Sequence, residues 1–231
     1  MKKYELTAEF IEQWGKKLFR IKALISFGSV EAGELGGYVE KEDNLAQDGD
    51  AWVYGNARVC DDAWVCDNAW VCDNARVCDN AWVCDNARVC DNVMVCDNAR
   101  VCDNAWVCDN ARVYGNAWVC DNARVCDNAW VCDNARVCDN AWVCDNADYL
   151  LIGRIGSRFS FTTFFKNKDK GITVSCGCFL GTIAEFRAKV TDTHGNNKHA
   201  KIYNLAADMA ELQILGEEHF DKLNTNKSEP F

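Results

Sequence analysis

The stretch AWVYGNARVCDDAWVCDNAWVCDNARVCDNAWVCDN, residues 51–86, decides the fold of this 231-residue chain. It opens a hexapeptide pattern, A-(W/R)-V-C-D-N, that occurs sixteen times between residues 51 and 146 without insertion or deletion. Periods of about 20 to 50 residues are typical of stacked helical units, whereas a hexapeptide period is typical of parallel β-helices. The repeat therefore predicts a mainly β solenoid in which each coil covers the strand edges of the coil before it.

Each hexad predicts one short strand and one corner. Ala and Val recur at alternate positions of the run Ala-Arg-Val-Cys, so both are expected to point inward, with Trp, Arg and Cys pointing outward. Asp-Asn follows at the corner, where we expect Asn to adopt the left-handed backbone conformation. The pattern resembles the left-handed hexapeptide β-helix, in which three sides close a triangular coil of 18 residues. In that family a small residue follows an aliphatic one by four places, as Ala57 follows Val53 here.

Degraded hexads extend the repeat towards the N-terminus. Gly33-Glu-Leu, Val39-Glu-Lys and Leu45-Ala-Gln keep the inward positions in register, so the solenoid is expected to span residues 33–147 in about six coils. At ~4.8 Å per strand layer the rod would be roughly 30 Å long. An open first coil would expose a strand edge and an apolar core. We therefore expect residues 1–32 to form a β cap, with extended stretches at 3–7 and 18–27.

After residue 147 the period stops, and residues 148–215 are expected to form a small α+β domain. Thr182-Ile-Ala-Glu185 has the pattern of a capping box, which predicts the start of a helix. Residues 216–231 form a polar tail. The expected elements are a strand at 149–155, a hairpin of residues 162–165 and 172–179, a helix ending near His194, and a second helix at 197–214.

Two parts of the chain resemble known proteins. The run FGSVEAGELGGYVE at residues 27–40, followed by DNLAQDGDAWVYGNA at 43–57, resembles the opening of uncharacterised hexapeptide-repeat proteins of bacteria and phages. The segments IGSR (155–158), TTFF (162–165), VSCGCF (174–179), GT (181–182), THG (193–195) and KHA (198–200) resemble the small α+β domain that follows such solenoids in gut bacterial and phage proteins. The resemblance implies this architecture but no established activity. Some of these proteins are named acyltransferases, and that name rests on the fold alone.

Charge and hydropathy limit the classes of partner. The net charge is −10, and the sixteen hexads hold 15 Asp against 7 Arg. This balance argues against nucleic acid and membrane surfaces as partners. No apolar run approaches the ~18 residues needed to span a bilayer, and the N-terminus lacks a signal-peptide core. We therefore expect a cytoplasmic protein.

Fourteen of the sixteen cysteines recur at hexad spacing between Cys60 and Cys144, which predicts three outward columns. Their Cβ atoms would lie ~4.8 Å apart, beyond the ~3.5–4.5 Å of an unstrained disulfide. Together with a cytoplasmic location, this spacing predicts free thiols packed as small apolar groups. An alternative is that the columns bind soft metal ions such as Cu(I), zinc or cadmium.

The outward Trp and Arg positions also predict columns, because residues 18 apart should be neighbours. Two columns mix the two residue types, so guanidinium planes should lie over indoles at ~0.5–1 kcal/mol per exposed contact. The third column contains Met94 and no regular alternation. The columns read Trp70, Arg88, Trp106, Arg124, Trp142; then Trp82, Arg100, Trp118, Arg136; then Arg58, Arg76, Met94, Arg112, Trp130.

The terminal domain holds the mixed Cys/His group of the sequence, namely Cys176, Cys178, His194 and His199. A C-x-C pair on one strand points both thiols to the same side, so a zinc site with the two histidines is one interpretation. A cysteine nucleophile activated by histidine is another. A third interpretation makes the cysteines half-buried packing residues and the histidines surface residues near helix ends.

The repeat argues against an enzyme. Hexapeptide acyltransferases use a catalytic His and a loop extruded from a coil, and the related carbonic anhydrases bind zinc through three His, but residues 1–193 contain no His. We therefore expect a non-catalytic scaffold or recognition protein without a cofactor. Its partner should bind through residues 148–215. Self-association through the Trp-rich sides is a further option, since exposed aromatic patches often mark interfaces.

Overall fold

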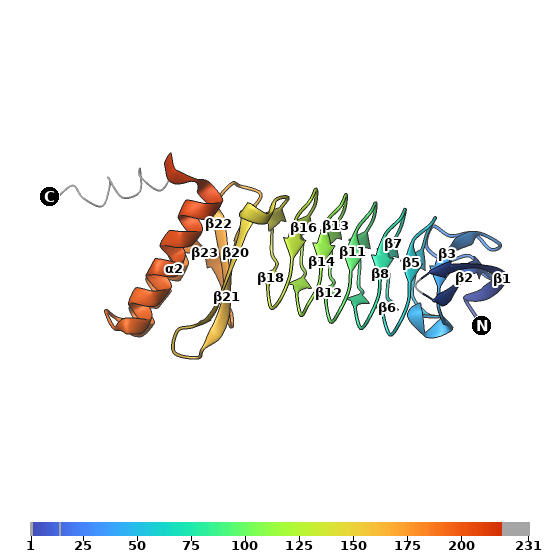
Figure 1. Ribbon diagram of the computed structural model, residues 1–231, viewed down its shortest axis with the longest axis horizontal. Coiled ribbons are helices and arrows are strands. Elements are labelled where there is room, and N and C mark those ends of the chain that lie inside the picture. Colours follow the sequence, from blue (N-terminus) through green and yellow to red (C-terminus); the bar gives the residue numbers. More distant parts are fainter. Residues whose placement is uncertain (1, 14, 219–231) are drawn as a thin grey trace.

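The computed structural model describes residues 2–13 and 15–218 and shows a rod of stacked coils (Figure 1). The N-terminus lies at one end of the rod, and an antiparallel sheet with two helices lies at the other. The predicted fold class, a parallel β-solenoid of about six coils with a small terminal α+β domain, is confirmed.

The sixteen hexads form sixteen strands of two residues each, an outward Trp, Arg or Met followed by an inward Val. Strands 18 residues apart pair in parallel register, as Arg88 does with Trp70 and Trp106. The predicted 18-residue coil is therefore confirmed. The strands are β4 (Trp52–Val53), β5 (Arg58–Val59), β6 (Trp64–Val65), β7 (Trp70–Val71), β8 (Arg76–Val77), β9 (Trp82–Val83), β10 (Arg88–Val89), β11 (Met94–Val95), β12 (Arg100–Val101), β13 (Trp106–Val107), β14 (Arg112–Val113), β15 (Trp118–Val119), β16 (Arg124–Val125), β17 (Trp130–Val131), β18 (Arg136–Val137) and β19 (Trp142–Val143).

The core of the rod consists of the inward Val and Ala rows. Val65, Val101 and Ala105 are fully buried, as are nearly all their equivalents. The backbone ladder is equally regular: the Trp82 N–H donates to the Ala99 carbonyl at 2.9 Å, and the Cys84 N–H donates to the Val101 carbonyl at 3.0 Å. Repeating apolar packing and satisfied backbone groups in every coil explain why six residues suffice to specify the fold.

The corner conformation differs from the prediction. Asp, and not Asn, adopts the left-handed backbone: Asp67 has φ 59° and Asp85 has φ 58°. The Asp67 carboxylate accepts a hydrogen bond from the backbone N–H of Asp85 in the next coil, at 3.3 Å. The following Asn instead stacks its amide, with Asn68 Nδ2 donating to Asn86 Oδ1 at 3.2 Å. The prediction of a left-handed Asn is therefore wrong. Asp takes the left-handed conformation and accepts a backbone N–H of the next coil, whereas Asn bonds to the Asn of the next coil.

A β-hairpin covers the first coil, with β1 (Tyr4–Gln13) antiparallel to β2 (Lys16–Ala23) and β2 antiparallel to β3 (Leu35–Val39). A short 3-10 helix, η1 (Glu42–Asn44), follows. Trp52 is fully buried beneath this cap, with ring centroids 6.1 Å from Tyr4 and 5.4 Å from Phe27. Lys3 is also buried, and its ammonium donates to the carbonyls of Asp48, Gly49 and Ala51. Burial lowers the pKa of Lys3 to about 8.

An antiparallel sheet closes the other end of the rod. It follows the short 3-10 helix η2 (Asn146–Asp148) and contains β20 (Tyr149–Ile155), β21 (Ser160–Lys166), β22 (Ile172–Cys176) and β23 (Phe179–Thr182). Phe165 belongs to the core of the rod, whereas Phe164 packs with the helices. The Thr163 hydroxyl accepts the Arg136 N–H at 3.1 Å. The sheet therefore lies between the last coils and the helical layer (Figure 1).

Two helices, α1 (Ile183–His194) and α2 (Lys198–Leu215), complete the domain. The predicted capping box is confirmed, since the Glu185 N–H donates to Thr182 Oγ1 and the Thr182 N–H donates to Glu185 Oε2. Arg187 joins the helices through Asp208 at 2.8 Å and the buried Glu211 at 2.7 Å. Neither of these described helices is long and apolar enough to cross a membrane.

Candidate functional site

The structure brings three of the four predicted site residues to one pocket of the terminal domain. Cys176, Cys178 and His194 line a pocket of about 400 Å³. His199 lies beside it, with its ring 5.8 Å from that of His194. The other lining residues are Ser157, Arg158, Ser160, Gly177, Thr193 and Tyr203.

The two thiols do not share a strand, so the expected C-x-C geometry is wrong. Cys176 is the last residue of β22, whereas Cys178 lies in the turn before β23 and is exposed. Gly177 between them has φ 61°, a conformation in which a side chain is strained. A strand would point both thiols to one face, whereas here Cys178 lies in a turn after the strand ends, and both thiols still line the same pocket.

Cys176 and the imidazoles each have neighbours of their own. The Thr162 hydroxyl donates to Cys176 Sγ at 3.2 Å. Tyr203 stacks on His194 at 5.8 Å between ring centroids, and burial followed by the neighbouring Cys176 raises the pKa of Tyr203 to about 12. His199 Nδ1 is buried and makes no hydrogen bond within the described residues. The pocket thus combines two thiols, an imidazole and a phenol with the Arg158 guanidinium.

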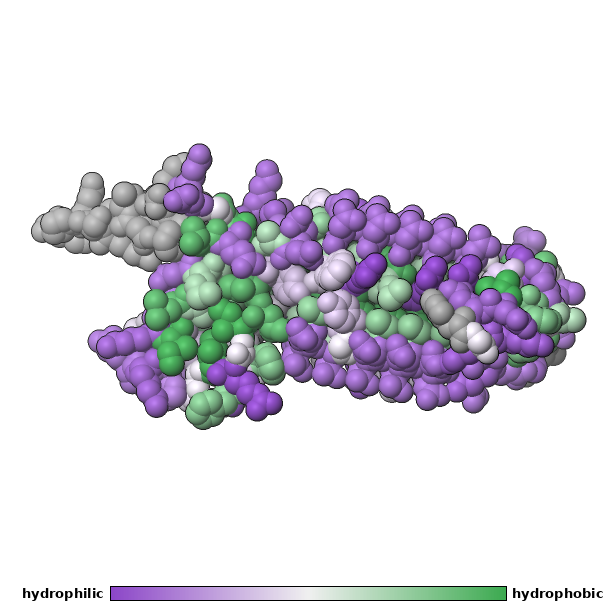
Figure 2. All heavy atoms as spheres, in the orientation of Figure 1, coloured by the Kyte–Doolittle hydropathy of each residue, from purple (hydrophilic) through white to green (hydrophobic). Residues whose placement is uncertain are grey.

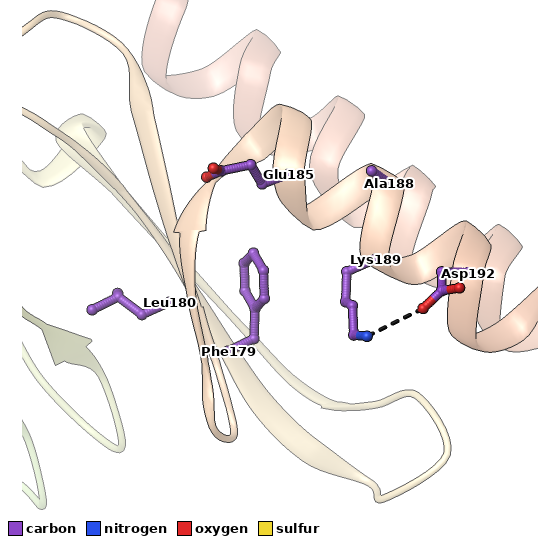
Figure 3. Close-up of a pocket in the computed structure, with 6 residues that line it drawn as sticks. All are labelled: Phe179, Leu180, Glu185, Ala188, Lys189 and Asp192. Carbon is purple, nitrogen blue, oxygen red and sulfur yellow. Dashed lines mark hydrogen bonds and ion pairs between the residues drawn. The ribbon is translucent and has the colours of Figure 1, made fainter.

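A second hollow lies between β23 and the outer face of α1 (Figure 3). Its volume is about 490 Å³. Figure 3 shows Lys189 directed at Asp192, and the two groups form an ion pair at 3.1 Å. Glu185 caps its own helix through Thr182. The charged groups around this hollow are therefore paired locally, and Phe179 with Leu180 supplies apolar surface.

The ladder cysteines form the three predicted columns. Within a column, consecutive thiols and the intervening carboxylate approach closely: the ligand atoms of Cys66, Asp67 and Cys84 lie within 4.8 Å of one another. The first column is interrupted by Tyr114. The columns are Cys60, Cys78, Cys96 and Cys132; Cys66, Cys84, Cys102, Cys120 and Cys138; and Cys72, Cys90, Cys108, Cys126 and Cys144.

One pair contradicts the prediction of free thiols. Cys126 and Cys144 form a disulfide, with their Cα atoms 4.6 Å apart. That separation lies inside the ~4.4–6.8 Å range of protein disulfides. The prediction treated the side chains as parallel vectors, whereas two thiols of one column can tilt towards each other. The remaining ladder cysteines of the described chain are free.

Hydrogen bonds tie the free thiols to the corners. Cys66 Sγ donates to Asp67 Oδ2, and Cys108 Sγ donates to Asp109 Oδ2, both at 3.1 Å. Burial and the adjacent Asp109 carboxylate raise the pKa of Cys108 to about 12. The indole N–H of Trp118 donates to Cys102 Sγ at 3.0 Å. Each column is thus a chain of donors and acceptors at the rod surface.

The predicted stacking of Arg on Trp is confirmed. Arg124 lies between two indoles, 4.5 Å from the ring centroid of Trp106 and 5.5 Å from that of Trp142. Contacts of this kind occur on all three sides of the rod. The others are Arg88 over Trp70 at 5.1 Å, Arg100 over Trp82 at 5.0 Å, Arg112 over Trp130 at 4.9 Å and Arg136 over Trp118 at 4.7 Å.

The exposed face of α2 is a feature that the sequence interpretation missed. Leu205 and Met209 are 63% and 57% exposed, and Ile202 and Leu212 flank them at 38% and 45%. Spacings of three and four residues place all four on one helix face. We call this set the α2 stripe. Figure 2 shows apolar surface gathered over the terminal domain, where Figure 1 draws α2.

The signal for this stripe was present in the sequence but ambiguous. The opposite face of α2 is also apolar, with Ala206, Ala207 and Ile214 buried against the sheet and α1. A helix that is apolar on two faces does not reveal which face meets the core.

The rod is similar to a known repeat. Residues 51–67 and 105–121 match a family described as YdcK beta solenoid repeat. This match covers two segments of the rod, so the resemblance of the terminal domain to those of bacterial and phage proteins stays a prediction. No curated protein matches the chain.

Proposed function

We propose that this protein is a non-catalytic cytoplasmic scaffold, a β-solenoid of left-handed sense that assembles through its terminal domain. The α2 stripe carries the proposal. The rod presents Trp and Arg on all three sides, so a partner would find no side that differs clearly from the others. The stripe is a contiguous apolar surface on one face only, and such surfaces are typical of interaction sites. The absence of His from residues 1–193 supports a non-catalytic role.

The partner that fits the stripe is the same helix of a second copy. In an antiparallel pair related by a two-fold axis, Leu205 would face the partner's Met209 and Ile202 would face the partner's Leu212. Two-fold pairing of identical surfaces is the commonest form of protein self-assembly. Four apolar side chains from each copy would then form a small buried core.

Charge at the ends of α2 favours this antiparallel arrangement. Lys198 and Lys201 are exposed at its N-terminal end, and Glu217 and Glu218 are exposed just past its C-terminal end. An antiparallel pair brings the lysines of each copy towards the glutamates of the other, whereas a parallel pair would bring like charges together. Complementary rim charges set orientation more than total affinity.

Charge reversal tests the proposal in the full-length chain. Lys198→Glu with Lys201→Glu makes the rim repulsive, as does Glu217→Lys with Glu218→Lys. Each double variant should weaken the dimer about tenfold or more in sedimentation experiments, since four rim pairs at ~0.2–1 kcal/mol each change sign. The new charges suit the helix dipole at both ends, so both variants should fold.

The combined four-residue variant is the decisive control, because it restores opposite charges across the antiparallel interface. Its dimer should regain most of the wild-type affinity. If the combined variant associates as weakly as the two double variants, the antiparallel pairing is wrong. If the wild-type chain is monomeric throughout, assembly through α2 is wrong altogether.

A further inference from the structure

The longest uninterrupted run of free thiols lies on one side of the rod. Cys66, Cys84, Cys102, Cys120 and Cys138 follow one another at every coil, and all five are free. Consecutive members lie close together: ligand atoms of Cys66, Asp67 and Cys84 lie within 4.8 Å of one another. Ligand atoms of Cys120, Asp121 and Cys138 lie within 4.8 Å of one another. This column is an uninterrupted row of free cysteines, one in each coil.

We propose that the thiol columns bind soft monovalent cations such as Cu(I), with one ion between each two consecutive thiols. A metal–thiolate bond of about 2.3 Å, the length that zinc makes to cysteine sulfur, places two sulfurs on opposite sides of one ion about 4.6 Å apart. Ligand atoms of Cys66, Asp67 and Cys84 lie within 4.8 Å of one another, a limit that admits this span. Thiolates favour soft metal ions, of which Cu(I) is one.

Coordination number and charge favour a monovalent ion over zinc. Structural zinc sites converge four ligands in a tetrahedron. An interval of a column offers two thiols and one carboxylate, and that carboxylate already accepts a backbone N–H, as Asp103 Oδ2 accepts from Asp121 at 3.3 Å. A column of five thiolates that holds four Cu(I) ions releases five protons to solvent as it fills, so its net charge changes only by −1.

Indole N–H groups hydrogen-bond to sulfur atoms of two columns. The Trp118 indole N–H donates to Cys102 Sγ at 3.0 Å, and the Trp106 indole N–H donates to Cys90 Sγ at 3.2 Å. Donors around a metal ligand commonly orient it and tune its affinity. The intermediate exposure of Cys84 and Cys90 gives ions access from solvent.

The columns define a stoichiometry. Each five-cysteine column contains four intervals, and the column interrupted by Tyr114 contains two, between Cys60 and Cys96. Ten ions per chain are expected once the Cys126–Cys144 disulfide is reduced. Cys132 has no thiol one coil before it and none one coil after it, so it adds no interval.

Two matched variants separate binding by intervals from binding by independent thiols. Cys84→Ser with Cys120→Ser removes all four intervals of the uninterrupted column, whereas Cys66→Ser with Cys138→Ser removes two. Both variants lose two thiols. The chain is reduced, freed of reductant and titrated with Cu(I) without oxygen against a competing bathocuproine chelator, and bound ions are counted by native mass spectrometry.

The expected counts are ten ions for the wild type, six for the first variant and eight for the second. Circular dichroism checks that both variants keep the fold. X-ray absorption should show copper bound by two sulfurs. Equal losses in the two variants, or no Cu(I) held against the chelator by the folded wild type, would overturn the proposal.

Discussion

At the scale of the residue, the corner at residues 66–68 shows how three side chains of the repeat link one coil to the next. The thiol of Cys66 donates to Asp67, the Asp67 carboxylate accepts the backbone N–H of Asp85, and Asn68 donates its amide to Asn86. The Asp67 and Asn68 contacts join one coil to the next, and the Cys66 thiol holds the Asp67 carboxylate in place. A positive φ at Asp67 turns the carboxylate and the chain together, which explains why a short polar residue occupies this position.

The buried thiol of Cys108 predicts a pH-dependent stability. Its folded-state pKa is raised to about 12 from the ordinary value of 9.0, so the folded chain keeps this proton while the unfolded chain releases it. The stabilisation is complete below about pH 9 and falls as pH rises towards 12. Cys108→Ser removes this titration. Urea unfolding with reductant and chelator should show the variant closing on the wild type by ~1 kcal/mol between pH 8 and pH 10.

A constant difference between wild type and variant over this pH range would contradict the assigned role of Cys108. The serine hydroxyl does not titrate in this window, so the comparison isolates one thiol among many.

Residue identities predicted the inward rows and the Arg and Trp contacts, because period and register alone determine them. They assigned the left-handed conformation to Asn and not to Asp, although the sequence contains evidence for Asp. Gly55 and Gly115 replace Asp, while the following Asn is retained, and glycine is the residue that tolerates positive φ. The turn position of Cys178 was missed for a similar reason, since Gly177 beside it has a positive φ and marks the turn.

At the scale of the element, the terminal sheet serves both the rod and the helices. Side chains alternate along β21, so Phe165 enters the core of the rod and Phe164 enters the core beneath the helices. Both rings are fully buried. A solenoid requires a capping element at its open end. The sheet is that element, and it also provides the platform on which α2 lies.

Replacing each ring by alanine should therefore destabilise different layers. Phe165→Ala should cost ~3–5 kcal/mol and expose the last coils, and Phe164→Ala should cost a similar amount in the helical layer. Hydrogen exchange distinguishes the two variants. The amides of Arg124 and Cys126, which donate to the last coil, should lose protection in the first variant and keep more of it in the second.

Loss of protection in the same amides for both variants would contradict the two-sided role of the sheet. The sequence predicted most elements of this domain, including both helices, because the capping box and the apolar periodicity are local signals. It did not predict that β22 ends at Cys176 and that β23 begins separately at Phe179. Nor could local signals show which layer Phe164 and Phe165 each enter, since that depends on how the sheet packs against the rod.

At the scale of the whole molecule, the rod has two unlike ends. The N-terminal end is closed by the hairpin of β1 and β2, beneath which Trp52 and Lys3 are buried. The other end bears the α2 stripe, on the side of the sheet away from the rod (Figure 1). Pairing through the stripe would therefore place two rods on opposite sides of the interface, whereas pairing through the Trp-rich sides would lay them alongside each other.

Small-angle X-ray scattering of the reduced full-length chain, with mass measured on the same eluting peak, tests this assembly most directly. Our account predicts a dimer whose maximum dimension is close to twice that of the Leu205→Glu variant, which should be monomeric because it buries an unpaired charge at the centre of the stripe. A wild-type monomer, a dimer no longer than one rod, or a dimer that survives Leu205→Glu would contradict it.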